Sequence, residues 1–303
     1  MEKRIKVSKP LSDNMGESFK VLLDVLKEVN ELKSGDNIIL DLSKLDFVFP
    51  FLILPLSTLT SYLKNKEMTV NFELNNKCSS YLETIYFPNG FNPLGRSSWK
   101  SVLQSYSSKT YLPICLIPSR EDFYSSTIRE DLVSIFENIL VNQLRIDGQL
   151  KITISFLLFE AISNIVDHAK LENGYIMVQN YPKKDFLDVC IADHGIGILS
   201  TYNQERFSDI ETDIQALKSA VTGKSTKDQA ITRGYGISTS RKMLVKGLQG
   251  KYFLFSGNAF YFYSDEQEVI NELDNSFKWN GTIVALRIPK NIPKDFKYSD
   301  YTE

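Results

Sequence analysis

Apolar residues recur every three or four positions in several segments, which is the period of an amphipathic helix. This pattern predicts helices over residues 15–32, 51–64, 78–87, 128–144 and 152–170. Short runs rich in Ile, Leu, Val and Phe, bounded by polar residues, are typical of buried strands. They predict strands over residues 37–42, 68–74, 111–117, 186–192, 251–255 and 281–288. Helices and strands that alternate along the chain are typical of an α/β fold.

The chain has 303 residues, which is enough for two domains of ordinary size. The first strand and helix alternation ends near residue 95, and the next residues are rich in Ser. We therefore predict a small α/β domain over 1–95, a connecting segment over 96–124, a larger α/β domain over 125–292 and a C-terminal tail over 293–303.

Composition narrows the range of partners. The chain carries 35 basic and 37 acidic residues, a balance that gives no electrostatic case for nucleic acid or an anionic membrane. Its longest apolar run, 47–56, is short and contains two prolines, and no apolar signal segment follows the N-terminus. Three widely spaced cysteines fit a reducing compartment and argue against a zinc cluster. We expect a cytoplasmic protein with no membrane or nucleic-acid partner.

The helix predicted over 152–170 carries a polar stripe on an otherwise apolar sequence. Glu160, Asn164 and His168 follow one another at a spacing of four, so they lie on one face. Burying such a stripe is costly unless it meets polar partners, and Mg²⁺ with a triphosphate would supply them. The amide oxygen of Asn164 suits Mg²⁺, and Glu160 is one turn away, where a carboxylate can activate a nucleophile. The alternative is a solvated helix face.

Two glycine-rich turns follow this helix in the sequence. Residues 193–198, Asp-His-Gly-Ile-Gly-Ile, come directly after a predicted apolar strand. A carboxylate at Asp193 can accept a hydrogen bond from the exocyclic amine of adenine, which GTP lacks at that place. Residues 233–237, Arg-Gly-Tyr-Gly-Ile, precede a predicted helix whose free N–H groups favour phosphate. The polar stretch 222–229 between them is predicted to be a mobile lid, with Lys224 or Arg233 available to neutralise phosphate charge.

In this order and spacing, the three segments resemble the N box and the two glycine boxes of the GHKL ATP-binding fold. Gyrase-type topoisomerases, GHKL heat-shock chaperones, histidine kinases and MutL share that fold. The resemblance spans about 125–290 and implies a Bergerat-fold α/β sandwich that binds ATP and Mg²⁺. It implies that Asn164 binds Mg²⁺, that Glu160 is the general base and that Asp193 recognises adenine. The other nucleotide contacts that it implies are His168, Gly195, Gly197, Lys224, Arg233, Gly234, Tyr235, Gly236 and Thr282.

Two details refine this resemblance. His168 matches the histidine that ends the first box in the serine-kinase branch, the anti-sigma-factor kinases. Asp167 departs from the family, because many histidine kinases have a basic residue there that contacts phosphate. We expect Asp167 to face solvent or to pair with a lysine. Gly281-Thr282 resembles the closing Gly-Thr of the family, whose hydroxyl reaches the adenine end through water.

The first domain carries a second resemblance. Residues 38–48 resemble the core strand and loop of STAS domains, the fold of anti-sigma-factor antagonists. Where that family often has a phosphorylated serine, this chain has Phe49-Pro50-Phe51, which offers no hydroxyl. A STAS-like domain here is therefore expected to dock or sense a protein partner rather than accept phosphate. A small α/β domain of unspecified role is the alternative.

These features lead to three hypotheses. The first is a signalling ATPase or serine/threonine protein kinase with a fused STAS-like module. The second is an ATP-gated clamp, which would need a transducer domain from a partner because about fifteen residues follow Ile288. The third is a nucleotide-binding regulator without turnover. A conventional histidine kinase is rejected because no histidine precedes His168. The protein partner stays open, and a homodimer is among the assemblies considered.

Overall fold

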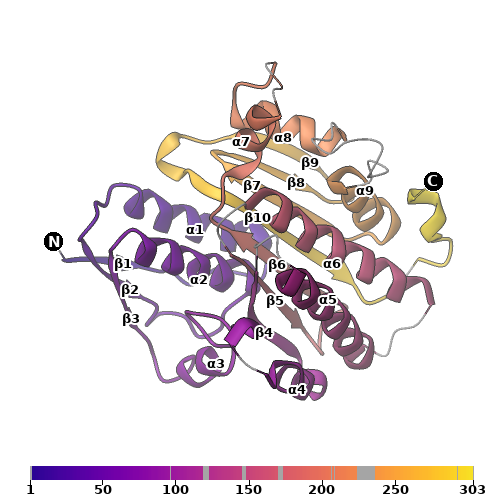
Figure 1. Cartoon of the computed structure of the whole chain (residues 1–303), viewed down its shortest axis with the longest axis horizontal. Coiled ribbons are helices and arrows are strands. Elements are labelled where there is room, and N and C mark those ends of the chain that lie inside the picture. The colour runs from indigo at the N-terminus through magenta and orange to yellow at the C-terminus, as the bar shows by residue number, and fades with distance from the viewer. Residues whose placement is uncertain are drawn as a thin grey trace.

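The computed structural model describes residues 2–95, 97–118, 123–144, 148–169, 173–205, 207, 209–223, 236–291 and 293–302. They form a mixed α/β structure with a three-stranded parallel sheet and a seven-stranded antiparallel sheet (Figure 1). The α/β class predicted from the sequence is thereby confirmed. No helix in the described part of the chain has the length and apolar character needed to cross a membrane.

Residues 2–95, here called the N-terminal unit, form the three-stranded sheet and three helices. The strands are β1 (Glu2–Lys6), β2 (Asn37–Asp41) and β3 (Thr69–Glu73), in that order across the sheet. The helices are α1 (Met15–Val29), α2 (Pro50–Asn65) and α3 (Ser79–Thr84). The helices and strands predicted in this region are confirmed, except that β1 was not foreseen because it buries little besides Ile5.

The seven-stranded sheet contains the longest strands of the molecule. Its order is β4-β5-β6-β10-β7-β8-β9. The strands are β4 (Tyr111–Ile117), β5 (Gly174–Asn180), β6 (Phe186–Asp193), β7 (Lys251–Gly257), β8 (Ala259–Tyr263), β9 (Glu268–Glu272) and β10 (Trp279–Pro289). The last strand in the sequence, β10, inserts between β6 and β7, so it is central to the sheet.

Helices cover one face of this sheet (Figure 1). They are α5 (Phe123–Leu144), α6 (Gly148–Ala169), α7 (Gly197–Gln204), α8 (Asp213–Thr222) and α9 (Gly236–Lys242). A π-helical turn, Met243–Gly247, continues α9, and single 3-10 turns occur at Pro93–Gly95, Ser105–Ser108, Asn275–Phe277 and Tyr298–Tyr301.

The N-terminal unit packs against the other face of the seven-stranded sheet. Side chains alternate across a strand, so Ile176 and Val178 of β5 join the core under α5 and α6, whereas Tyr175 and Met177 join the core shared with α1 and α2. Every residue of β5 is buried for this reason. The sheet is therefore enclosed on both sides, which matches the continuous apolar runs of its central strands.

The segment predicted to connect the two domains contributes regular structure. Residues 95–108 were expected to be a linker or loop, but they contain α4 (Trp99–Gln104), which buries Trp99 and Leu103 against the main core. β4 follows it and forms an edge of the seven-stranded sheet. The domain boundaries given above stay predictions.

Candidate functional site

Asp193 is a buried carboxyl group at the carboxyl end of β6. Its residue is 3% exposed, and its register partners are Gly174 on β5 and Thr282 on β10. One carboxylate oxygen accepts a hydrogen bond of 2.7 Å from the backbone N–H of Gly195, and the backbone N–H of Thr282 also donates to this carboxylate. Burial raises the pKa of Asp193 to about 7, and the two backbone donors oppose that rise.

Gly281 is the residue that allows this close packing. Its φ of +107° lies in the left-handed region that favours glycine. A Cβ at this position would lie 2.3 Å from the backbone oxygen of Asp193 and 2.7 Å from its Oδ1. The register between β10 and β7 shifts between Trp279 and Thr282, so the chain bends here. The approach of β10 to Asp193 therefore requires glycine at position 281.

The second glycine of the 193–197 turn is also constrained, although less tightly than Gly281. Gly197 begins α7 with a φ of +76°, and a Cβ there would lie 3.1 Å from the Oγ of Ser256 on β7. The Ser256 hydroxyl donates to the backbone oxygen of Gly281 over 2.7 Å and accepts from the N–H of Ile198 over 3.1 Å. Ser256 thus ties the turn to β10. The sequence-based prediction missed Ser256, whose only signal is a polar residue within an aromatic strand.

Glu160 and Asn164 lie on α6, which packs over the sheet near its center (Figure 1). Both side chains are partly buried. α6 ends at Ala169, and β5 begins at Gly174, whose register partner is Asp193. The C-terminal end of α6 therefore lies at the same end of the strands as Asp193. Asn164 is in the C-terminal part of α6, the part nearer to this end.

Glu160 also has identified neighbours. Its charge lies close enough to Tyr252 on β7 and to Tyr298 near the C-terminus to help raise the pKa of each hydroxyl, after burial, which is the larger cause for both. Tyr298 in turn packs its ring edge-on against Phe156 of α6, with ring centers 6.0 Å apart. Glu160 therefore lies in the neighbourhood of two tyrosines.

The remaining predicted residues divide into two groups. Gly195 donates to Asp193, as described above, and Gly236 begins α9 with open space where a Cβ would be, so sterics do not explain that glycine. Lys224, Arg233, Gly234 and Tyr235 lie outside the described residues, as do most of the predicted lid and the side chains of Asp167 and His168.

The described residues that flank the predicted lid are held together by Arg241. Its guanidinium donates to the backbone oxygen of Val221, in the last turn of α8, over 2.7 Å. It also donates to the Tyr261 hydroxyl over 2.7 Å and to a carboxylate oxygen of Glu268 over 3.0 Å. Arg241 therefore joins the end of α8 to α9 and to the sheet. The sequence-based prediction had assigned it no role.

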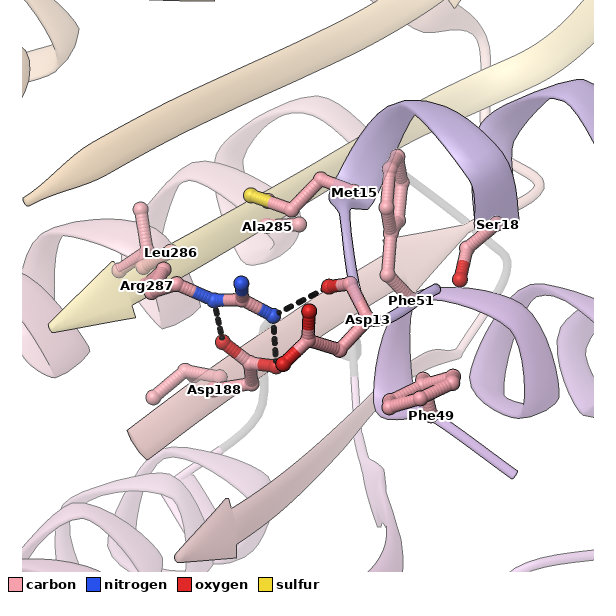
Figure 2. A pocket seen from close by; sticks show the side chains of 10 residues that line it. Asp13, Met15, Ser18, Phe49, Phe51, Asp188, Ala285, Leu286 and Arg287 are labelled. Carbon is pink, nitrogen blue, oxygen red and sulfur yellow. Dashed lines mark hydrogen bonds and ion pairs between the residues drawn. The ribbon is translucent and has the colours of Figure 1, made fainter. Parts of the chain in front are cut away.

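A small pocket lies between the N-terminal unit and the opposite end of β6 and β10 (Figure 2). The Arg287 guanidinium makes two hydrogen bonds to the Asp188 carboxylate, of 2.7 and 2.8 Å, and a third to the backbone oxygen of Asp13. Lys184 pairs with the Asp13 carboxylate. Phe49 lines the same pocket. These charges satisfy one another, so the pocket is a polar connection between the two parts of the chain.

No protein-family model matches this chain, and comparisons with curated proteins and with solved structures gave no significant match. Within the described ranges, no group of three or more His, Cys, Asp or Glu side chains is arranged to hold a metal ion.

Proposed function

We propose that this protein binds ATP together with Mg²⁺ at the edge of the seven-stranded sheet where β6 ends, in the manner of a GHKL domain. The observation that carries the proposal is Asp193. Its carboxyl group is buried, receives two backbone N–H groups and faces the helix-covered side of the sheet by strand alternation. A buried carboxylate at the end of a central strand is a selective acceptor for the exocyclic amine of adenine.

The donor set around this edge fits the proposed ligand. Asn164 would hold Mg²⁺ through its amide oxygen, and water and phosphate oxygens would complete the shell, because Mg²⁺ takes few protein ligands. The bound ion would neutralise charge on the phosphates. Glu160, one helical turn before Asn164, would accept the proton of an attacking water or hydroxyl. Gly281 supports the proposal because it leaves the backbone without a side chain beside Asp193, and Gly197 leaves none beside Gly281.

The activity that follows is hydrolysis of ATP or transfer of its γ-phosphate to serine or threonine of a partner protein. We further propose that the N-terminal unit is a STAS-like docking module for that partner. Its α/β order with a parallel sheet supports this assignment, and Phe49-Pro50-Phe51 provides no phosphate acceptor. The buried free thiols of Cys78, Cys115 and Cys190 support a reducing, cytoplasmic setting.

A second candidate is a nucleotide-dependent regulator that does not turn over. One observation favours it: the charge of Glu160 acts on the hydroxyls of Tyr252 and Tyr298. A tyrosine hydroxyl that donates to this carboxylate would compete with a nucleophile for it. The two candidates share the binding site and differ only in what happens to the γ-phosphate.

Incubation with γ-labelled ATP tests both levels of the proposal. Bound label, free phosphate and protein-attached label are measured separately for the wild type, Asn164→Ala and Glu160→Ala. We expect Asn164→Ala to lose Mg²⁺-dependent binding, and Glu160→Ala to keep binding while turnover falls about 100-fold or more, the range typical of a lost general base. Wild-type turnover with free phosphate indicates an ATPase, and label on protein indicates a kinase.

Three results would contradict parts of this account. Absence of ATP binding by the wild type refutes the proposed function. Unchanged Mg²⁺-dependent binding by Asn164→Ala refutes the metal assignment. Binding without release or transfer of label by the wild type, even with candidate partners present, favours the regulator over the enzyme. Glu205→Ala, on the exposed end of α7, is a matched control for loss of a carboxylate and should behave as the wild type.

A further inference from the structure

A stack of three rings joins the N-terminal unit to the turn that holds Asp193. The ring of Tyr62, on α2, lies parallel to the imidazole of His194, with centers 4.4 Å apart and an angle of 15° between the planes. His194 also contacts the indole of Trp279 on β10, with centers 3.9 Å apart and an angle of 34° between the planes. His194 immediately follows Asp193 in the sequence. The N-terminal unit therefore reaches the residue next to the proposed adenine acceptor.

Hydrogen bonds from the same rings act on the backbone around Asp193. The indole N–H of Trp279 donates to the backbone oxygen of Asp193 over 2.9 Å. The side-chain amide of Asn280 donates to the Tyr62 hydroxyl over 3.0 Å. Asn280 directly precedes Gly281, the glycine that packs against Asp193. Tyr62 is thus linked to both sides of the Asp193–Gly281 contact.

α1, a second helix of the N-terminal unit, contacts the loop that connects β9 to β10. Asn30 forms the C-cap of α1, and its side-chain amide donates to the backbone oxygens of Ser276 and Lys278 over 2.9 Å each. These oxygens belong to the connection between β9 and β10. α1 and α2 together therefore fix the segment that leads into Trp279 and Thr282.

Strand alternation explains why two different parts of the molecule contact this one turn. Ile191 belongs to the core under the helices and Ala192 to the core shared with the N-terminal unit. Continuing the alternation directs Asp193 toward the helices and His194 toward the N-terminal unit. His194 is 8% exposed; neither ring nitrogen has a partner within ordinary hydrogen-bond geometry among the described residues, but the imidazole interacts weakly with the backbone of Asn280. Its closest described contacts are thus the rings of Tyr62 and Trp279 and the backbone of Asn280.

We infer that Tyr62 and His194 are positioning residues for the proposed nucleotide site. The N-terminal unit, through the ring stack, holds the Asp193 turn and the Gly281-Thr282 segment in the arrangement that recognises adenine. This inference rests on the proposed ATP binding. Coupling between two sites is reciprocal, so adenine nucleotides must also strengthen the contact between α2 and the β9–β10 connection. A partner that displaces Tyr62 would then weaken ATP binding.

The test compares full-length variants by titration with Mg-ATP and Mg-GTP. Tyr62→Ala removes the stack and Asn280→Ala removes only the hydrogen bond, whereas Tyr62→Phe retains the stack. Tyr81→Ala is the matched control: Tyr81 also joins the N-terminal unit to the sheet, through a hydrogen bond of 2.7 Å to Gln179, but Gln179 pairs with Asp188, five residues along β6 from Asp193.

We expect these substitutions to weaken the binding of ATP through its adenine base. Tyr62→Ala should bind ATP about five- to tenfold more weakly, the effect of losing one aromatic pair, with a smaller change for GTP. Asn280→Ala should lose about two- to threefold, the low end for one hydrogen bond. Tyr62→Phe should lose no more than Asn280→Ala, and Tyr81→Ala should match the wild type. A merely structural role would weaken ATP and GTP equally and would make Tyr81→Ala behave like Tyr62→Ala.

Hydrogen exchange of the wild type provides an independent measurement. Saturating Mg-ATP should slow amide exchange in the last turn of α2 and in residues 276–280. Wild-type ATP binding with no such protection, or with an unchanged ATP affinity in both Tyr62→Ala and Asn280→Ala, overturns the coupling and leaves the proposed function intact. If Tyr62→Ala does not fold, Asn280→Ala and the exchange measurement decide. A wild type that binds no ATP refutes the proposed function itself.

Discussion

At the scale of single residues, burial favours the neutral form of two neighbouring ionisable groups and therefore shifts their pKa values in opposite directions. Burial raises the pKa of Asp193 to about 7 and lowers the pKa of His194 to about 3. His194 therefore stays neutral in its ring stack near neutral pH, and a folded-state pKa below the ordinary value gives stability that is lost as pH falls below about 6.5. Asp193 changes its charge within the physiological range.

The titration of Asp193 predicts a pH dependence of ATP binding. Above pH 7 the ionised carboxylate accepts a hydrogen bond from the adenine amine. Below pH 7 the protonated carboxyl group carries an O–H donor, which is a poorer partner for the N–H donor of the amine. ATP affinity of the wild type should therefore fall as pH decreases through about 7, by at most about tenfold per pH unit. Asp193→Asn should bind ATP more weakly and should lose this step, because its amide does not titrate.

Titration of wild type and Asp193→Asn in parallel from pH 5.5 to 8.5 checks this expectation. The difference between the two curves cancels the protonation of the γ-phosphate, which titrates in the same range. Parallel curves, or equal affinities of the wild type for ATP and GTP, would show that Asp193 does not recognise the base.

At the scale of elements, the bend of β10 at Gly281 determines the shape of the site. A side chain there meets two problems, the left-handed φ of +107° and the contact with Asp193. Gly35 has only the first of these two constraints. Its φ is +84°, but a Cβ at this position would meet no other atom within 4 Å. The comparison of these two glycines isolates the steric contribution of the β10–Asp193 contact.

We predict that Gly281→Ala lowers the free energy of unfolding by about 2–4 kcal/mol, from backbone strain and overpacking together. Gly35→Ala should lower it by only about 1–2 kcal/mol, the cost of the left-handed conformation. Urea denaturation of both variants measures the difference. Equal losses would mean that β10 relaxes away from Asp193 without cost.

The elements also show which parts of the molecule can be predicted from sequence. The continuous apolar run of β6 and the periodic face of α1 were found because their signals are local. β5 was missed, since a strand of seven buried residues that ends in Gln-Asn has no polar alternation to reveal it. α8 was missed as well, because its ten residues bury only three apolar side chains. Short or doubly buried elements depend on tertiary contacts that periodicity does not reveal.

The candidate site follows the same division. Asp193 and Gly197 were identified because residues 193–198 form one local motif. Ser256 and Trp279 were not, because they reach this turn from positions 58 and 86 residues away in the sequence. Contacts over such distances are set by the pairing of β10 with β6 and β7, which the sequence pattern does not specify.

At the scale of the whole molecule, the N-terminal unit is part of the structure that supports the site. Its helices share a hydrophobic core with one face of the seven-stranded sheet, and Arg287 joins the two parts at the end opposite Asp193 (Figure 2). The contacts of Tyr62 and Asn30 bring this unit to the turn after β6 and to the connection between β9 and β10. This arrangement gives the proposed docking module a direct route to the proposed nucleotide site.

A crystal structure grown with Mg²⁺ and a non-hydrolysable ATP analogue would locate both the base and the metal ion. We predict that the adenine amine lies within hydrogen-bond distance of the Asp193 carboxylate, about 3 Å, and that Mg²⁺ binds the amide oxygen of Asn164. An analogue bound with its base away from Asp193, or no bound analogue at millimolar concentration, would contradict this prediction.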